Sequence, residues 1–284
     1  MAASAPLPIV WLNGDWLPIG AARISPLDRG FLFGDAVYEV IGVYDGRPVL
    51  LAEHLARLTR SLAALEIAAP HDDAHWRDLL EGLVTRNGGG DMGLYLQVSR
   101  GADCGRDHVF PAGIAPTVFA MATPLRPVDL DRAAVSALTA PDNRWGRCDI
   151  KSTALLANVL LRQAAAEAGA GESILLRDGW LTEGSGSTVA IVEAGVLVTR
   201  PNGPDVLPGT TIGLIRRLAA AAGIRYREEP VSEARLRHAD EIWLTAALRG
   251  VAPVTRLDGQ PVGTGTPGPY WRTVAEAYER HKRS

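Results

Sequence analysis

Tight-turn dipeptides between short apolar runs are the feature that most constrains the fold of this chain. Asn13-Gly14 separates the apolar runs of VWLNGDWLP, and Asp45-Gly46 does the same in AVYEVIGVYDGRPVLL. Such pairs favour the two-residue turns that join antiparallel strands, because both residues tolerate a positive φ. Asp178-Gly179 and Ala194-Gly195 repeat the pattern later in the chain. They predict an antiparallel meander of short strands there.

Helical periodicity interrupts these strands. Five leucines recur at helical spacing: Leu51, Leu55, Leu58, Leu62 and Leu65. Further helices are predicted over residues 75–87, 210–222, 232–238 and 269–281. Since the elements do not follow one another as repeated βαβ units, the pattern predicts an α+β fold.

The segment TPLRPVDLD at residues 123–131 is the best candidate linker. It carries two prolines and polar residues between periodic elements. A chain of 284 residues is long enough for two domains of ordinary size. We therefore expect an N-terminal domain over residues 1–122 and a C-terminal domain over residues 132–284.

Composition excludes several classes of function. A formal net charge of -3, with no Lys/Arg block, argues against a nucleic-acid partner. No apolar run approaches the ~20 residues of a membrane span, and the first residues lack a charged leader with an apolar segment. We therefore expect a cytoplasmic protein without a membrane partner. Cys104, Cys148 and the six histidines show no metal-ligand spacing, so we expect two free thiols and no metal site.

Lys151 has an unusual neighbourhood. It directly precedes Ser152, where an Ala/Leu-rich helix is predicted to begin. A lysine at the positive end of a helix, close to Arg144 and Arg147, is expected to favour the neutral amine, a nucleophile that can form a Schiff base. The alternative is a surface lysine at a loop-to-helix junction. The apolar residues expected on the buried face of that helix are Leu155, Leu156, Val159 and Leu160.

Other candidates each have an ordinary structural interpretation. Pro208-Gly209 before Thr210-Thr211 indicates a helix start that binds phosphate, or a simple helix cap. Glu183 lies beside a Gly/Ser loop and can be a solvated turn residue. Tyr38 fits a half-buried strand, and Arg57 lies off the leucine stripe, so its default position is solvent-facing. The GTGTPG motif lacks a βαβ context and is interpreted as a loop.

Taken together, these segments resemble the fold-type IV pyridoxal-phosphate aminotransferases, most closely the bacterial D-amino-acid aminotransferases. The resemblance extends in order from near residue 28 to the last helix. It implies a two-domain α+β fold, with a small α/β N-terminal domain and a larger C-terminal domain containing an antiparallel pseudo-barrel. The segments that carry it are DRGFLFGDAVYEVIGVYDG, EHLARL, SRGADCGRDHVFP, RWGRCDIKS, LTEGSGSTV, LPGTT and RLDGQPVGTGTPGPYW.

The resemblance also implies roles for single residues. Lys151 would carry pyridoxal 5'-phosphate as a Schiff base and would move the substrate proton. Glu183 looks like the carboxylate that pairs with the pyridine nitrogen and improves the electron sink. The remaining implied cofactor contacts are Arg57, Ser187, and the backbone N–H groups of Thr210 and Thr211.

Tyr38, Arg106 and His108 match the trio by which D-amino-acid aminotransferases bind the substrate carboxylate. In the family the Arg-x-His pair comes from the other subunit, which implies a homodimer with shared active sites. The implied reaction moves the amino group of a D-amino acid such as D-alanine to 2-oxoglutarate or pyruvate.

The sequence departs from this pattern at two loops. Gly186 replaces a usual Ser or Ala, and residues 246–249, Ala-Ala-Leu-Arg, replace a Ser/Thr-rich loop. Arg249 could meet a second carboxylate or form a surface pair. The second loop is closer to aminodeoxychorismate lyase-like relatives, which keeps that activity open. (R)-selective amine or branched-chain transamination and a non-catalytic scaffold are further alternatives.

Overall fold

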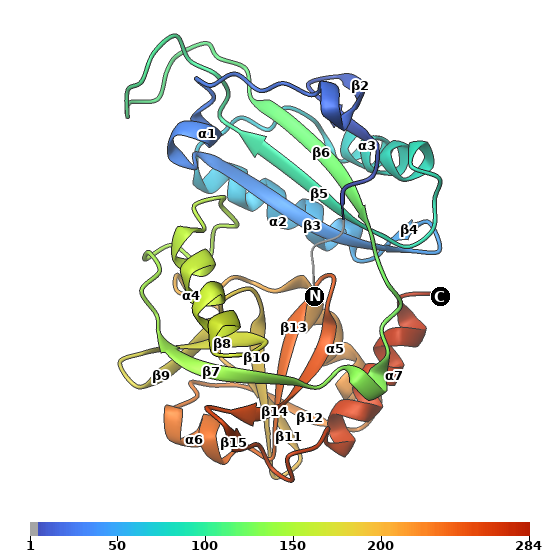
Figure 1. The fold of residues 1–284 in the computed structure, drawn as a ribbon, viewed down its shortest axis with the longest axis vertical. Helices are drawn as coiled ribbons and strands as arrows, with labels where there is room; N and C mark the ends of the chain where they lie inside the picture. Colours follow the sequence, from blue (N-terminus) through green and yellow to red (C-terminus); the bar gives the residue numbers. More distant parts are fainter. Residues whose placement is uncertain (1–4) are drawn as a thin grey trace. The chain divides into compact units, whose positions relative to one another are not determined.

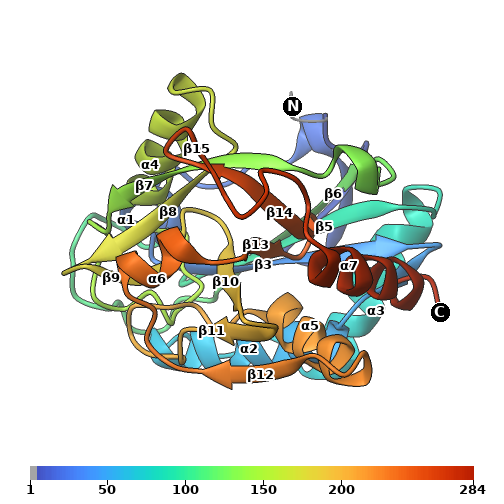
Figure 2. The same ribbon diagram turned by 90° about the horizontal axis from the view of Figure 1, so that it is seen from below.

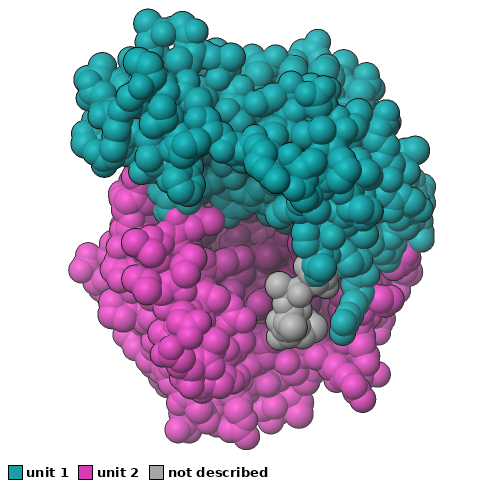
Figure 3. Space-filling view, turned by 45° about the horizontal axis from the view of Figure 1, so that its top comes forward, with its two compact units in different colours: residues 1–126, 150–154 teal, residues 127–149, 155–284 magenta. Residues whose placement is uncertain are grey.

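The computed structural model describes residues 5–284, which form two compact units (Figure 3). The first unit extends to Arg126 and also includes Ile150–Ala154. The second comprises Pro127–Asp149 and Leu155–Ser284. Residues 150–154, expected within the C-terminal domain, lie with the first unit because Ile150 packs in its core and Ser152 forms a bridge with Val37.

The first unit contains a six-stranded antiparallel sheet in the order β2-β1-β6-β5-β3-β4 (Figure 1). The strands are β1 (Ile9–Leu12), β2 (Asp15–Pro18), β3 (Ala36–Tyr44), β4 (Arg47–Pro48), β5 (Met92–Ser99) and β6 (Thr117–Pro124). Both predicted hairpins are confirmed. Asn13 and Gly14 have φ of 50° and 106°, and Asp45 and Gly46 have φ of 51° and 77°.

Helices cover one face of this sheet. They are α2 (Leu51–Ala64) and α3 (Asp73–Arg86), while the short α1 (Arg29–Phe33) was not expected from the sequence. Leu55 and Leu58 of the predicted stripe pack in the core with Val37 and Ile41. Because side chains alternate along a strand, Tyr38 lies on the opposite face of β3. A 3-10 helix, Ile19–Ala21, follows β2.

The second unit is built on a nine-stranded mixed sheet that curls round on itself (Figure 2). Its order is β12-β11-β10-β13-β14-β7-β8-β9, with β15 beside β14. The pairs β11–β12, β14–β7 and β7–β8 are parallel, and the other pairs are antiparallel. The strands are β7 (Val135–Pro141), β8 (Glu172–Arg177), β9 (Trp180–Gly184), β10 (Thr188–Glu193), β11 (Val196–Thr199), β12 (Arg225–Glu228), β13 (Glu241–Ala246), β14 (Gly250–Leu257) and β15 (Gln260–Pro261).

The predicted meander is only partly right. The turns at Asp178-Gly179 and Ala194-Gly195 join β8 to β9 and β10 to β11, as expected. However, β10 pairs with β13 and not with β9. β10 is an inner strand between β11 and β13, and its residues Val189 to Val192 are at most 2% exposed. β9 lies at the end of the sheet.

Four helices belong to the second unit: α4 (Leu156–Glu167), α5 (Thr210–Ala221), α6 (Glu233–His238) and α7 (Pro269–His281). The last three confirm the sequence predictions to within one residue. A 3-10 helix, Leu130–Arg132, overlaps the end of the predicted linker. Among residues 5–284, no helix has the length and apolar character needed to cross a membrane.

The prediction for α4 was wrong in its start and in its buried face. The helix begins at Leu156, because the Thr153 N–H donates to Ala36 O and Ser152 forms an isolated antiparallel bridge with Val37, so these residues lie outside the helix. The side chains that pack inward are Leu161 and Ala165. Three residues expected to be buried are exposed instead: Leu156 by 73%, Val159 by 59% and Leu160 by 58%.

Candidate active site

Lys151 is fixed on an extended segment that runs beside β3. Its carbonyl accepts a hydrogen bond from the Tyr38 N–H at 3.0 Å, and its own N–H donates to the Ser61 Oγ at 3.2 Å. The ammonium nitrogen lies 4.2 Å from the centre of the Tyr38 ring. Lys151 is therefore not at a helix terminus, and the helix-dipole argument made from the sequence does not apply.

Both arginines that closely precede Lys151 in the sequence are ion-paired. Arg144 is bound by the carboxylates of Asp142 and Glu183, and Arg147 by that of Asp149. The chain contains a single further lysine, Lys282, whose Nζ lies 2.6 Å from the Glu279 carboxylate and whose side chain is 1% exposed. Lys282 is thus held in a buried ion pair.

Tyr38 lies beside two residues that the sequence analysis did not identify, Tyr95 and Gln97. Its ring stacks on that of Tyr95 with centroids 5.7 Å apart, and the Tyr95 hydroxyl donates to Gln97 Oε1 at 2.6 Å. Burial raises the pKa of Tyr95 to about 12, and the neighbouring Tyr38 adds to this effect. The Tyr95 phenol therefore stays protonated and can donate a hydrogen bond. Because side chains alternate between the faces of a strand, the sequence indicates that Tyr95 and Gln97 share one face of β5. It does not indicate that β5 pairs with β3.

Arg57 is buried, contrary to its default solvent-facing interpretation. Its Nε and Nη2 each donate to the Glu39 carboxylate at 2.8 Å, and His54 Nδ1 lies 2.7 Å from the same carboxylate. Burial favours the neutral acid, but hydrogen bonds from Arg57 and His54 outweigh it and lower the pKa of Glu39 to about 2. Glu39 thus remains a carboxylate that orients Arg57. The sequence offered no signal for this three-residue cluster.

Arg106 and His108 occupy an exposed loop of the first unit. The Arg29 guanidinium holds this loop by donating to Asp107 O at 2.6 Å and to His108 O at 3.2 Å. The Arg106 guanidinium carbon lies 4.9 Å from the Phe33 ring centre, and the His108 ring centroid lies 5.2 Å from it. Both side chains thus pack on α1 and extend into solvent.

Glu183 lies at the end of β9 and is 6% exposed. Its Oε1 accepts from Arg144 Nη1, and its Oε2 accepts the Leu207 N–H at 3.1 Å. Arg144 also binds the Asp142 carboxylate at 2.8 Å and Asp205 O at 3.0 Å. Burial opposes the charge on Arg144, but its two carboxylate partners outweigh burial and raise its pKa. Glu183 is therefore a buried, oriented carboxylate rather than a solvated turn residue.

The amino end of α5 fits an anionic group such as phosphate. Its N-cap, Gly209, gives no side-chain capping bond, and a Cβ there would lie 2.7 Å from the Thr188 hydroxyl. Thr245 stands opposite Thr188 in the β10–β13 pair, and its buried hydroxyl has no hydrogen-bond partner among the described residues. A helix start, a close-approach glycine and an unsatisfied hydroxyl favour an acceptor-rich ligand beside Thr210 and Thr211.

Ser187 is committed to a neighbouring carboxylate. Its hydroxyl donates to Glu172 Oε2 at 2.9 Å, and the Ser185 hydroxyl donates to Glu172 Oε1. Only its lone pairs remain for another ligand. Glu172, 2% exposed, was not identified from the sequence.

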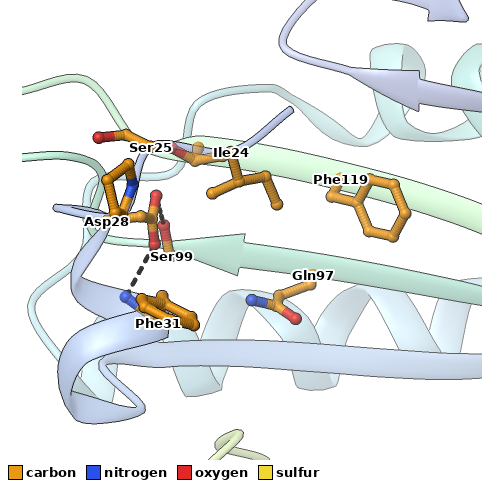
Figure 4. A pocket seen from close by; sticks show the side chains of 10 residues that line it. Ile24, Ser25, Asp28, Phe31, Gln97, Ser99 and Phe119 are labelled. Carbon is orange, nitrogen blue, oxygen red and sulfur yellow. Dashed lines mark hydrogen bonds between the residues drawn. The ribbon is translucent and has the colours of Figure 1, made fainter. Parts of the chain in front are cut away.

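The sequence-derived residues are thus distributed over both units. Lys151, Tyr38 and Arg57 belong to the first unit with the Arg106–His108 loop, and the second unit holds the others: Glu183, Ser187, Thr210 and Thr211. A pocket in the first unit contains none of them; it is lined by Asp28, Phe31, Gln97 and Phe119, among others (Figure 4). Among residues 5–284, no group of three His, Cys, Asp or Glu side chains could hold a metal ion.

Comparisons with known proteins agree over nearly the whole chain. The family described as Amino-transferase class IV matches residues 36–257. The chain is 41% identical to a D-alanine aminotransferase of Bacillus licheniformis, with 95% of each chain covered. It is 34% identical to a D-alanine aminotransferase of Staphylococcus haemolyticus, with 97% of this chain and 98% of the relative covered.

Solved structures show the same fold. An Escherichia coli branched-chain amino acid aminotransferase has a TM-score of 0.89 at 25% identity, covering 98% of this chain and 95% of its own. A hypothetical aminotransferase from Mycobacterium tuberculosis, in a pyridoxal-phosphate-bound form, has a TM-score of 0.83 at 28% identity, with 95% and 98% covered. The two-domain α+β fold expected from the sequence is confirmed. This chain belongs to the class IV aminotransferases, a family of pyridoxal-phosphate-dependent enzymes.

Proposed function

We propose that this protein is a D-amino-acid aminotransferase that transfers the amino group of D-alanine or a similar D-amino acid to a 2-oxo acid such as 2-oxoglutarate or pyruvate. The near-full-length similarity to D-alanine aminotransferases carries this proposal. The placement of Lys151 against Tyr38 supports it. Because the amine lies on one face of the ring, a ligand can reach it only from the side away from Tyr38.

Lys151 is the proposed covalent anchor and proton carrier. Bound to a lysine amine, pyridoxal phosphate supplies an electron sink for the charge left when the substrate loses its α-proton. The Lys151 amine would take up that proton and give it up again in the following step. Its backbone bonds to Tyr38 and Ser61 fix the main chain from which the amine extends.

Glu183 is the proposed partner of the pyridine nitrogen. Its carboxylate would keep that nitrogen protonated, which strengthens the electron sink. Arg144 fixes the orientation of Glu183. Thr210, Thr211 and Arg57 are the proposed phosphate contacts, with the Thr245 hydroxyl as a further donor. Ser187 is a proposed contact elsewhere on the cofactor, at a group that donates to its lone pairs.

Tyr38, Arg106 and His108 are the proposed substrate-carboxylate site, shared between the subunits of a homodimer. Arg106 and His108 are exposed, and within their own chain they pack on Phe33. Large apolar side chains are exposed near them on the same loop and on α1, and also on α4: Val109 by 72%, Phe31 by 76%, Leu156 by 73%. Apolar exposure of this extent favours an interface with a second copy. The proposed location of the dimer is the cytoplasm.

Aminodeoxychorismate lyase activity is the second candidate, because the Ala-Ala-Leu-Arg loop at 246–249 resembles that of such lyases. The absorbance spectrum of the cofactor-loaded protein separates the two. We expect D-alanine, but neither L-alanine nor (R)-1-phenylethylamine, to convert the yellow band of the lysine-bound cofactor to the pyridoxamine form. A spectrum unchanged by D-alanine, with pyruvate released from aminodeoxychorismate, would establish the lyase instead.

A further inference from the structure

Arg29 is a buried arginine that the proposed mechanism does not use. It is the first residue of α1 and is 3% exposed. Its Nη1 donates to Asp107 O at 2.6 Å and to Val109 O at 3.3 Å, and its Nη2 donates to His108 O at 3.2 Å. Buried guanidinium groups usually bind carboxylates, whereas this one also binds three consecutive backbone carbonyls. One cation therefore fixes the path of the main chain around His108.

A carboxylate and a second arginine hold Arg29 in place. Asp35 Oδ2 accepts from Arg29 Nε at 2.9 Å and from Arg100 Nε at 2.8 Å, and Asp35 Oδ1 accepts from Arg100 Nη2 at 3.1 Å. Arg100 also donates to Leu65 O at 2.6 Å and to Glu66 O at 3.0 Å, just after α2. Burial opposes the charge on Asp35, but the hydrogen bonds from the two arginines outweigh it and lower the pKa of this carboxyl. Asp35 is thus a carboxylate that joins Arg29 to the ends of β5 and α2.

The start of α1 also fixes the base of the loop that follows β5. The Arg29 N–H donates to Gly101 O at 2.9 Å, and Asp28, the N-cap of α1, forms a bridge with Ala102. Gly101 has a φ of 112°, and a Cβ there would collide with Ala115 O, so the two ends of the loop are in close contact. Residues 103–116 form neither helix nor strand and are mostly exposed. The position of this loop therefore depends on a few polar contacts, of which Arg29 supplies those to the middle and to the base.

Phe33, one turn later on α1, supports the side chains that this loop carries. The Phe33 ring centre lies 4.9 Å from the guanidinium carbon of Arg106 and 5.2 Å from the ring centroid of His108. The guanidinium carbon of Arg29 lies 4.9 Å from the same ring centre. An aromatic face attracts cations and other rings, so it favours defined positions for both loop side chains. The backbone and the side chains of the Arg-x-His pair are thus both placed by α1.

From this geometry we propose that Arg29 is a positioning residue for the substrate-carboxylate site. By holding the carbonyls of residues 107–109, it sets where Arg106 and His108 present their donors, and so determines how tightly a substrate carboxylate is bound. The inference rests on the proposed aminotransferase function, in which these two residues bind the carboxylate. Arg29 acts only through them, because it is buried and each of its three guanidinium nitrogens already donates to an acceptor of the chain.

The test compares Arg29→Met and Arg29→Lys with the wild-type protein by steady-state kinetics. D-Alanine and 2-oxoglutarate share an α-carboxylate, so Arg29→Met should raise the KM of both by about tenfold while kcat changes by less than about threefold. Arg29→Lys keeps a charge beside Asp35 but lacks the planar fork, and its KM values should lie between the two. Arg23→Met is the matched control, because the exposed Arg23 also donates to two backbone carbonyls, those of Gly20 and Ala22. It should change neither KM.

A merely structural Arg29 would give a different result. Its loss would then lower kcat, or the absorbance of the lysine-bound cofactor, while both KM values stay at the wild-type level. That outcome overturns the proposal. If Arg29→Met does not fold, Arg29→Lys with a wild-type Tm decides by the same criterion.

A binding measurement separates failure of this inference from failure of the proposed function. Acetate is a bare carboxylate and should raise the Tm of the cofactor-loaded wild-type protein. Arg29→Met should need about tenfold more acetate for the same increase. If the wild-type protein transfers nothing from D-alanine, the proposed function is wrong. An equal dependence on acetate in the wild-type and Arg29→Met proteins overturns the positioning role of Arg29, whether or not D-alanine is a substrate.

Discussion

The Lys151 ammonium lies 4.2 Å from the centre of the Tyr38 ring, and a Tyr38 N–H to Lys151 O hydrogen bond of 3.0 Å joins their backbones. The amine is therefore positioned by the residue that also belongs to the proposed carboxylate site. Any change in one of the two residues is expected to affect the other.

Replacing Lys151 by Ala should abolish the covalent cofactor adduct that borohydride traps, because the nucleophilic amine is gone. Lys282→Ala should retain the adduct, since Lys282 is occupied by Glu279. Mass spectrometry of the reduced, digested protein measures both. A normal adduct in the Lys151→Ala protein would contradict the assignment.

Replacing Glu183 by Gln should lower kcat by roughly a hundredfold or more, because a neutral amide does not keep the pyridine nitrogen protonated. Arg144→Met should lower kcat in the same direction, since Glu183 loses the guanidinium that orients it. Steady-state kinetics with D-alanine checks this. Arg147→Met serves as the control because Arg147 pairs with Asp149 near the surface. A loss as large in that variant would argue against a specific role for Arg144.

Glu39 should make the stability of the protein depend on pH in the acid range. Its pKa in the folded protein is about 2, below the ordinary 4.5, so its stabilising contribution is complete above pH 4.5 and is lost as the pH falls through 2. The difference corresponds to about 3 kcal/mol. Thermal unfolding of wild-type and Glu39→Gln protein between pH 7 and pH 2 measures it.

The Glu39→Gln protein should be less stable at pH 7 by roughly 3 kcal/mol or more, because Arg57 is left buried without its carboxylate. It should also lose part of the acid dependence. Glu81→Gln on the exposed side of α3 is the control and should leave both unchanged. Parallel curves for wild-type and Glu39→Gln would exclude Glu39 as the titrating group.

The two cysteines should differ strongly in reactivity. Burial raises the pKa of the Cys148 thiol to about 11, despite the opposing charge of Arg144, whereas Cys104 is exposed. Less thiolate and less access both slow the reaction of Cys148. At pH 8 we expect one fast and one slow thiol with a disulfide reagent, and Cys104→Ser should remove the fast phase. Loss of the fast phase in Cys148→Ser would reverse the assignment.

The exposed apolar face of α4 should be part of the subunit interface. Replacing Leu156 and Val159 by Ser is expected to shift the protein from a dimer, twice 30.2 kDa, toward the monomer. Light scattering after size-exclusion chromatography gives the mass. Glu81→Gln, at an exposed position of α3, should stay dimeric. A variant that keeps both the dimer mass and its stability to dilution would place the interface elsewhere.

The sequence by itself determined the local elements of this protein. Turn dipeptides such as Asp45-Gly46 specified hairpins because the required positive φ depends on only two residues. The leucine stripe specified α2, and the order of motifs singled out Lys151, because both are properties of neighbouring positions. Residues with a strong local signal were therefore found.

Tertiary structure decided everything that depends on distant partners. Lys151 lies beside β3 and not at a helix start, because hydrogen bonds to β3 hold the following residues extended. Glu39 and Arg144 are buried, but nothing in the sequence indicated this. A charged residue is expected on the surface unless an oppositely charged partner is known to lie beside it. The face of α4 that looked like core is exposed because Leu161 and Ala165 pack inward instead. Periodicity shows that a helix has an apolar face, but only the packing of the other elements determines what covers it.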